Sequence, residues 1–204
     1  MNHADPNITK IQYAKYLAAS LAYLASLQGD ATGLYVFKND GIFSMTPKQD
    51  YQHLARLFYQ LSEINPKGTF TKQIEYSALF SGAQKRELLV FITDLYQKEN
   101  DIYRLLDTLC SLRHEIVVFH LLARNEMELN FQGFSTFEDL ETGETIQIDQ
   151  NKARTAYRKN LENYLAQTRI EMLDRKISYR PLTIDEPLDQ ALRDFLKQRN
   201  KLKI

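Results

Sequence analysis

Apolar residues repeat at helical spacing in some parts of the chain and run without interruption in others. Helical spacing marks residues 7–27, 47–64, 101–113 and 151–176. Two segments are apolar throughout, "LLVFIT" at 88–93 and "EIVVFHLLA" at 115–123, apart from their ends and one histidine. Runs of this kind are typical of strands covered on both faces, as in a parallel sheet between two layers of helices. The pattern therefore predicts an α/β fold.

Shorter segments complete the predicted order. "GLYVF" at 33–37 and "IFSM" at 42–45 flank Asn-Asp-Gly, which favours a tight hairpin because Asp-Gly adopts positive φ at little cost. The remaining expected elements are a weaker helix at 72–80, a small hairpin or turn at 137–149 with Gly143 at its tip, and a last strand at 177–182. A closing helix follows, capped by Asp185 and with Pro187 in its first turn. No repeat or low-complexity linker interrupts this order, so residues 1–204 are expected to form one domain.

Charge and composition narrow the classes of function. The 26 Lys and Arg residues balance the 26 Asp and Glu residues, so no overall basic field favours nucleic acid or an anionic membrane. No apolar run reaches the roughly 18 residues needed to span a bilayer. The single cysteine, Cys110, cannot form an internal disulfide, which fits a reducing compartment. We therefore expect a cytoplasmic chain without a membrane segment.

Catalytic motifs give a mostly negative result. The sequence contains no Gly-x-Gly-x-x-Gly, His-Glu-x-x-His or Gly-x-Ser-x-Gly pattern. His120 lies inside an apolar run, where a hydrogen-bonded core histidine is commoner than a ligand or base. Cys110 lies on the apolar side of a helix and is expected to pack there. No nucleophile is paired with a base, so we do not expect an enzyme.

Asp94 follows directly after the apolar run at 88–93. In open α/β sheets, ligands gather outside the carboxyl ends of the strands. A carboxylate there is a hard oxygen ligand suited to Mg²⁺, Mn²⁺ or Ca²⁺. The alternative is that Asp94 only caps the turn after the strand. Position alone leaves both interpretations open.

Four segments together resemble the bacterial "domain of unknown function 58" proteins, whose carboxyl-terminal half is a von Willebrand factor type A domain. They are "KIQYAKYLAASLAYLASLQGDATGLYVF" at 10–37, "LLVFITDLY" at 88–96, "FEDLETGETIQID" at 137–149 and "ISYRPLTIDEPLDQALRDFL" at 177–196. The resemblance implies a Rossmann-like three-layer sandwich with a mostly parallel sheet. It also implies a metal-ion-dependent adhesion site built from an Asp-x-Ser-x-Ser loop, a threonine and a late aspartate.

On this chain the late aspartate corresponds to Asp94 and the threonine to Thr69, with Thr71 as the alternative. Phe70 stands where many relatives have a second aspartate, and the sequence contains no Asp-x-Ser-x-Ser. The resemblance therefore implies an incomplete site, with Mg²⁺ bound weakly or not at all.

The resemblance also implies that the first, central strand of the sheet is missing, because the chain begins in the loop that follows it. In the family this strand lies between the strands that correspond to 33–37 and 88–93. A vacant central place exposes backbone groups and apolar side chains, so we expect self-association there. On this interpretation residues 1–204 are a single von Willebrand factor type A-like domain truncated at its amino terminus.

Two functional classes follow. The resemblance implies an interaction module that works beside a MoxR-type AAA ATPase in assembling or maturing other proteins, with the full-length protein near the membrane. The alternative is a metal-dependent hydrolase using Asp94, which needs a base and further ligands. The acidic turn at 138–144 and the charged helix at 151–176 are expected to be solvated surfaces.

Overall fold

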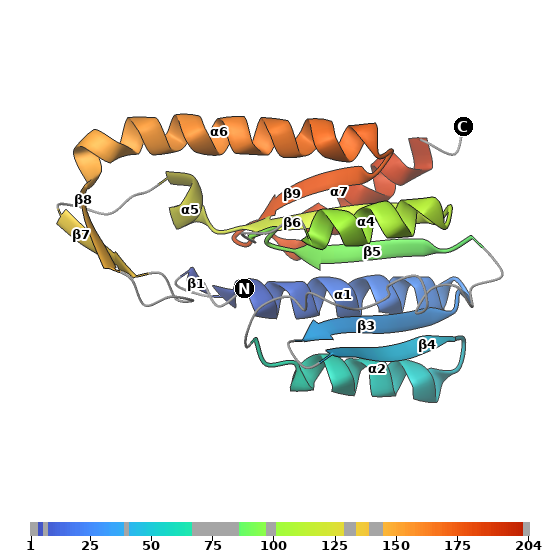
Figure 1. Ribbon diagram of the computed structural model, residues 1–204. Coiled ribbons are helices and arrows are strands. Elements are labelled where there is room, and N and C mark those ends of the chain that lie inside the picture. Colours follow the sequence, from blue (N-terminus) through green and yellow to red (C-terminus); the bar gives the residue numbers. More distant parts are fainter. Residues whose placement is uncertain are drawn as a thin grey trace.

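The computed structural model describes residues 4–5, 8–38, 41–66, 86–96, 101–128, 134–138 and 145–201 (Figure 1). The predicted helix at 72–80 and the tip residue Gly143 lie outside the described residues. Within the described part, mixed helices and strands form the α/β fold that the apolar pattern predicts. None of the helices in this part is both long and apolar enough to cross a membrane. The single-domain organisation stays a prediction.

The amino-terminal elements begin with helix α1, Lys10–Leu27. It starts three residues later than predicted because Thr9 caps it: the Thr9 side chain accepts from the backbone N–H of Gln12, and the Gln12 side chain accepts from that of Thr9. The predicted hairpin follows as β3, Thr32–Lys38, and β4, Gly41–Lys48. Helix α2, Tyr51–Glu63, begins at its cap Asp50 and not at residue 47, because β4 continues to Lys48.

The parallel sheet has the strand order β5-β6-β9. Its strands are β5, Leu88–Thr93, β6, Glu115–Leu122, and β9, Ser178–Thr183. The register pairs Val90 with Val117, and Val117 with Ser178. Both apolar runs are therefore parallel strands, as predicted. The carboxyl ends of the strands lie together at one end of the sheet, which we call the carboxyl edge. Among the described strands β6 is central and β5 lies at one side.

Helices cover both faces of this sheet. Val117, Phe119 and Leu121 of β6 pack in one core with α1 and with α7, Leu188–Lys201. Ile116 and Val118 of the same strand pack in a second core with α4, Asp101–Ser111, and with Met172 of α6, Gln150–Asp174. Alternating residues of β6 thus face opposite cores, as a strand's two-residue period requires. The result is three layers, helices, sheet and helices.

The β3–β4 hairpin is separate from the parallel sheet. The described strands form four separate sheets, and β3 pairs only with β4 among them. Side chains nevertheless connect the two parts, since Phe37 contacts Phe91 of β5 edge to face with ring centroids 6.1 Å apart. Helix α1 contacts β3, β5 and β6. Among the described strands, β3 and β5 therefore do not pair with each other.

A further hairpin lies away from the sheet, at the amino-terminal end of α6 (Figure 1). Its strands are β7, Phe134–Glu138, and β8, Thr145–Asp149, which pair antiparallel and confirm the hairpin predicted at 137–149. Three short elements were not predicted: β1, Ala4–Asp5, β2, Ile8–Thr9, and the single-turn helix α5, Arg124–Glu128. Each is too short to show a periodic pattern in the sequence.

The closing helix corrects one prediction. Asp185 was expected to cap it, with Pro187 inside the first turn. Instead α7 begins at Leu188, and the Pro187 carbonyl accepts from the backbone N–H groups of Gln190 and Ala191 at 3.0 and 3.2 Å. Asp185 lies outside the helix and forms an ion pair with Arg124. Asp185 therefore pairs with the first residue of α5 instead of capping α7.

Candidate functional site

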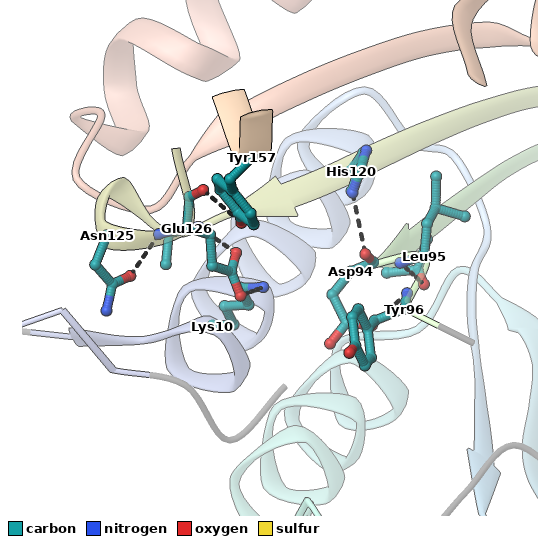
Figure 2. A network of polar contacts seen from close by, with 10 residues as sticks. Lys10, Asp94, Leu95, Tyr96, His120, Asn125, Glu126 and Tyr157 are labelled. Atoms are coloured by element: carbon teal, nitrogen blue, oxygen red, sulfur yellow. Dashed lines mark hydrogen bonds and ion pairs between the residues drawn. The ribbon is translucent and has the colours of Figure 1, made fainter. Parts of the chain in front are cut away.

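Asp94 lies at the carboxyl edge of the sheet, directly after β5 (Figure 2). One oxygen of its half-buried carboxylate accepts from the backbone N–H of Tyr96 at 3.4 Å. Burial acts to raise the pKa of this carboxyl, but nearby positive charge, Lys10 included, and the Tyr96 N–H outweigh it and hold the pKa below its usual value. Asp94 is therefore ionised at neutral pH. Asp94 closes a turn and also stands at the predicted edge, while its role as a metal ligand stays a prediction.

The turn after Asp94 is held in an uncommon conformation. Leu95 has a φ of 51°, in the left-handed region that residues with a side chain seldom adopt. Thr93 accepts the Leu95 N–H through Oγ1 at 3.0 Å, and the Tyr164 hydroxyl donates to the Leu95 carbonyl at 3.3 Å. Such a conformation costs on the order of 1–3 kcal/mol and persists only where the surroundings impose it. Here two hydrogen bonds and the burial of Leu95 do so.

His120 supports the same turn from the neighbouring strand. Its side chain is fully buried, with 1% of the residue exposed. Nε2 lies 3.0 Å from the Asp94 carbonyl oxygen, which can only accept, so Nε2 carries the proton. Nδ1 lies 2.6 Å from the Tyr179 hydroxyl and accepts from it. The prediction of a hydrogen-bonded core histidine is confirmed.

Burial lowers the pKa of His120 from 6.5 to about 4, although the Asp94 carbonyl acts in the opposite direction. The imidazole is therefore neutral at neutral pH. Burial likewise raises the pKa of the Tyr179 hydroxyl, so that it keeps its proton and can donate. The network from Tyr179 through His120 to Asp94 consists of neutral donors and acceptors, and it positions the main chain that carries the Asp94 carboxylate.

A second charged pair, not predicted from the sequence, lies beside Asp94 (Figure 2). Lys10, the first residue of α1, is 4% exposed, and its Nζ lies 2.6 Å from Oε1 of Glu126 in α5. Oε2 of Glu126 accepts the backbone N–H of Ala123 at 2.9 Å, and the Tyr157 hydroxyl donates to the Glu126 carbonyl at 2.8 Å. The pair joins the amino terminus of α1 to the end of β6.

One signal in the sequence could have revealed Lys10. The buried positions of α1 are Lys10, Tyr13, Ala14 and Leu17, which have the spacing of one helix face. A lysine on that stripe is either at its end or paired with a carboxylate. Glu126 gave no comparable signal, because it lies in the single turn α5.

The predicted metal ligands are only partly placed by the structure. Thr69 and its alternative Thr71 lie outside the described residues. In the part of the chain that the structure describes, no three His, Cys, Asp or Glu side chains come close enough together to hold a metal ion. Asp94 contributes one carboxylate, and the neighbouring Glu126 is already bound to the ammonium of Lys10. These described donors do not fit a hard divalent cation, which takes six or more oxygen ligands.

The other singled-out residues take structural places. Cys110 is half-buried against the α4 core, and its thiol lies 3.6 Å from the Arg175 carbonyl oxygen. Burial raises the pKa of this thiol, so it is a poor nucleophile at neutral pH. The side chains of the acidic turn at 138–144 lie outside the described residues. Most of the α6 positions with described side chains are exposed, as the charge pattern predicts.

Comparisons with known proteins add the relatives of the chain. A family model described as "Protein of unknown function DUF58" matches residues 2–170. Among solved structures, the chain is similar to an aerotolerance-related membrane protein from Bacteroides fragilis NCTC 9343 that was solved with multiple mutations to serines. The TM-score is 0.55 and the sequence identity 16%, and the match covers 94% of this chain and 88% of that one. It is similar to the conserved hypothetical protein BatB from Bacteroides thetaiotaomicron with a TM-score of 0.52, the same identity and the same coverage. No curated protein sequence matches the chain significantly.

Proposed function

This chain belongs to the DUF58 family of proteins of unknown function, and we propose that it is a protein-interaction module and not an enzyme. The observation that carries the proposal is the construction of the carboxyl edge. Asp94 is ionised and held on a turn that His120 and Tyr164 fix in place. A charged group on a rigid support favours binding, because little ordering is needed when a partner docks.

The finer fold assignment belongs to the same proposal. We assign a von Willebrand factor type A-like arrangement with a degenerate metal-ion-dependent adhesion site. The three layers around a parallel sheet and the position of Asp94 after β5 support it. The degeneracy is supported by the nearby positive charge, Lys10 included, that lowers the pKa of Asp94.

For the partner, we propose a MoxR-type AAA ATPase, with which the chain works in assembling or maturing other proteins. The support is the sequence resemblance and the family match. We also propose that the chain works on the cytoplasmic side of a bacterial membrane as part of a membrane-associated protein. The similar structure from Bacteroides fragilis is described as a membrane protein, which supports that placement by analogy of fold.

The hydrolase alternative receives no comparable support. A hydrolase using Asp94 needs a base beside it, and His120 is the imidazole next to this turn. Both of its ring nitrogens are engaged, one by the Tyr179 hydroxyl and one by the Asp94 carbonyl. Taking a proton from water would require breaking one of these buried hydrogen bonds. The geometry therefore favours a positioning role for His120 over a catalytic one.

Binding to the purified MoxR-type ATPase from the same genome, measured by biolayer interferometry with ATP present, tests the proposal. Asp94→Asn removes the charge and keeps the shape, and we expect about tenfold weaker binding, the loss typical of a central interface residue. Glu162→Gln, an exposed position on α6, is the matched control and should bind as the unaltered chain does. Absence of binding, or equal binding by Asp94→Asn, would refute the proposed role of this edge.

A further inference from the structure

The hydroxyl of Tyr13 is buried without a hydrogen bond. Tyr13 lies on α1 and is 3% exposed, and its oxygen has no partner among the described residues. A buried polar group without a partner costs free energy, and such groups are rare in folded proteins. The hydroxyls of Tyr157, Tyr164 and Tyr179, by contrast, each donate to an acceptor. Tyr13 is therefore an exception that its surroundings must explain.

This hydroxyl lies beneath the segment that joins β9 to α7, which we call the β9–α7 loop. Ile184 at the start of the loop and Leu188 just after it pack in the same core as Tyr13. Between them, Glu186 and Asp185 bring their carboxylates close enough to act on the hydroxyl. Burial first, and then these two charges, raise the pKa of Tyr13 to about 12. The hydroxyl therefore keeps its proton beside two carboxylates and donates to neither.

The loop and the first turn of α7 carry an excess of negative charge. Three carboxylates lie within five residues, at Asp185, Glu186 and Asp189. Asp185 pairs with Arg124, and Asp189 forms an ion pair within α7. Glu186 forms no ion pair in the part of the chain that the structure describes. Burial, and after it the charges of Asp194 and Asp185, raise the pKa of Glu186, so a further cation beside this carboxylate is favourable.

A cation at this place would account for both features. It weakens the repulsion between Glu186 and Asp185, so that the Glu186 carboxylate can move toward Tyr13 and accept its hydroxyl proton in a hydrogen bond. A guanidinium suits the place better than an ammonium, because its planar fork of N–H groups can pair with two carboxylates at once. Asp185 already pairs with the guanidinium of Arg124 in this way of recognition.

The exposure of the loop indicates where the guanidinium comes from. Asp185 and Pro187 are exposed and Glu186 is half-buried, whereas Tyr13 and Ile184 beneath them are buried. A shallow, negatively charged surface of this kind can hold the end of one side chain, whereas sites for small molecules enclose most of the ligand. Arginine is the charged residue most enriched in protein interfaces. A basic side chain on the surface of a partner protein therefore fits both the charge and the shape.

We propose that the β9–α7 loop, with the Tyr13 hydroxyl beneath it, is a docking site for an arginine side chain of a partner protein. The guanidinium pairs with the carboxylates of Glu186 and Asp185, and Glu186 then accepts from the Tyr13 hydroxyl. The loop follows β9, whereas Asp94 follows β5 at the other side of the same sheet. The proposal thus concerns a second site and goes beyond the function argued above.

An NMR titration of the full chain at constant ionic strength tests the proposal. The probe is the peptide acetyl-Gly-Arg-Gly-amide, and the signals are the backbone amides of Ile184, Glu186 and Leu188. These amides should shift with saturation as the peptide is added. The same peptide with citrulline in place of arginine keeps the shape and loses the charge, so it should leave them in place. Absence of a shift at the loop, or equal shifts with the citrulline peptide, would overturn the proposal.

Substitutions separate the two parts of the site. Glu186→Gln should weaken binding of the arginine peptide by about tenfold or more, because it removes the carboxylate that pairs with the guanidinium. Asp189→Asn is the matched control: it removes the same charge one turn away, from a carboxylate already paired and exposed, and should change binding by less than about twofold. Equal weakening by both variants would mean that the peptide responds only to the overall negative charge of this surface, which contradicts the proposal.

Tyr13→Phe gives a result that a purely structural role for the hydroxyl does not produce. Because the hydroxyl has no partner in the free chain, its removal should leave the melting temperature unchanged or raise it. The same variant should bind the arginine peptide about threefold more weakly, since the hydrogen bond to Glu186 forms only in the complex. A lower melting temperature together with unchanged binding would show that the hydroxyl serves the free fold and would refute its part in docking.

Two further measurements fix the source of the arginine and the independence of the site. Free arginine should bind no more tightly than the peptide, and binding about tenfold tighter would assign the loop to a small molecule and overturn the proposal. Asp94→Asn should leave the titration with the arginine peptide unchanged. This proposal and the ATPase proposal can therefore fail independently.

Discussion

The buried imidazole of His120 should make the stability of the protein depend on pH in a way that one substitution removes. The pKa of His120 lies at about 4 in the folded chain, below the 6.5 of an unburied histidine, chiefly because of burial. Between these values the unfolded chain binds a proton that the folded chain does not. Acidification therefore favours unfolding, and the stability present above about pH 6.5 is lost as the pH falls to about 4.

The magnitude follows from the shift. Each pKa unit corresponds to about 1.4 kcal/mol, so His120 alone should account for a loss of about 3 kcal/mol between neutral pH and pH 4. His120→Leu removes this titration. It should also cost about 2–4 kcal/mol at neutral pH, because the Tyr179 hydroxyl and the Asp94 carbonyl lose their partner. The variant should thus be less stable at pH 7 and less sensitive to acid.

The assay is urea unfolding followed by far-ultraviolet circular dichroism at several pH values, because the chain contains no tryptophan. Carboxylates titrate in both proteins, so their contributions cancel when the two curves are subtracted. Val118→Ala, two residues away on the same face of β6, is the control: it should destabilise without changing the pH dependence. Identical pH dependence in the unaltered chain and in His120→Leu would show that the imidazole is not held neutral as the structure indicates.

Three further predictions concern charge and backbone conformation. Lys10→Met should lower the free energy of unfolding by about 1–3 kcal/mol, because it leaves Glu126 without its cation. Adding Glu126→Gln should recover part of that loss in urea unfolding. No recovery would mean that the two side chains are not coupled. Calorimetry should detect no Mg²⁺ binding to the chain at low millimolar concentration, whereas tight binding abolished by Asp94→Ala would reveal a complete metal site. Lys176, exposed at a φ of 58° after α6, should give a chain more stable by about 0.5–1 kcal/mol when replaced by glycine, and a lower melting temperature would contradict this.

The sequence predicted the elements whose signal is long and regular. The runs at 88–93 and 115–123 became β5 and β6, because uninterrupted apolar character is needed wherever a strand is covered on both faces. The apolar pattern by itself could not place β5 within the sheet, because it reports which faces of a strand are covered and carries no information on which backbone edge is paired. Among the described strands, β5 pairs with β6 alone.

The candidate site was predicted in position but not in composition. Asp94 stands at the carboxyl edge, as its place after an apolar run indicated. Lys10 and Glu126 are 116 residues apart, and no local pattern reports a contact over that separation. Glu126 lies in α5, and it accepts from the Ala123 N–H as the third residue of a helix does when it reaches back to the cap. Only the return of β6 beside α1 brings these residues together.

The place of Lys10 shows why the charges at this edge act as one unit. A lysine in the first turn of a helix lies at the positive end of the helix dipole, which costs about 0.3–1 kcal/mol, and its burial adds a desolvation cost. Both costs are offset only if carboxylates lie close by, as Glu126 does at 2.6 Å. The same ammonium contributes to lowering the pKa of Asp94. Lys10 therefore interacts with two carboxylates, those of Glu126 and Asp94. The effects of Lys10→Met and Asp94→Asn on stability should be non-additive by about 1 kcal/mol, since residues in one charge network seldom act independently.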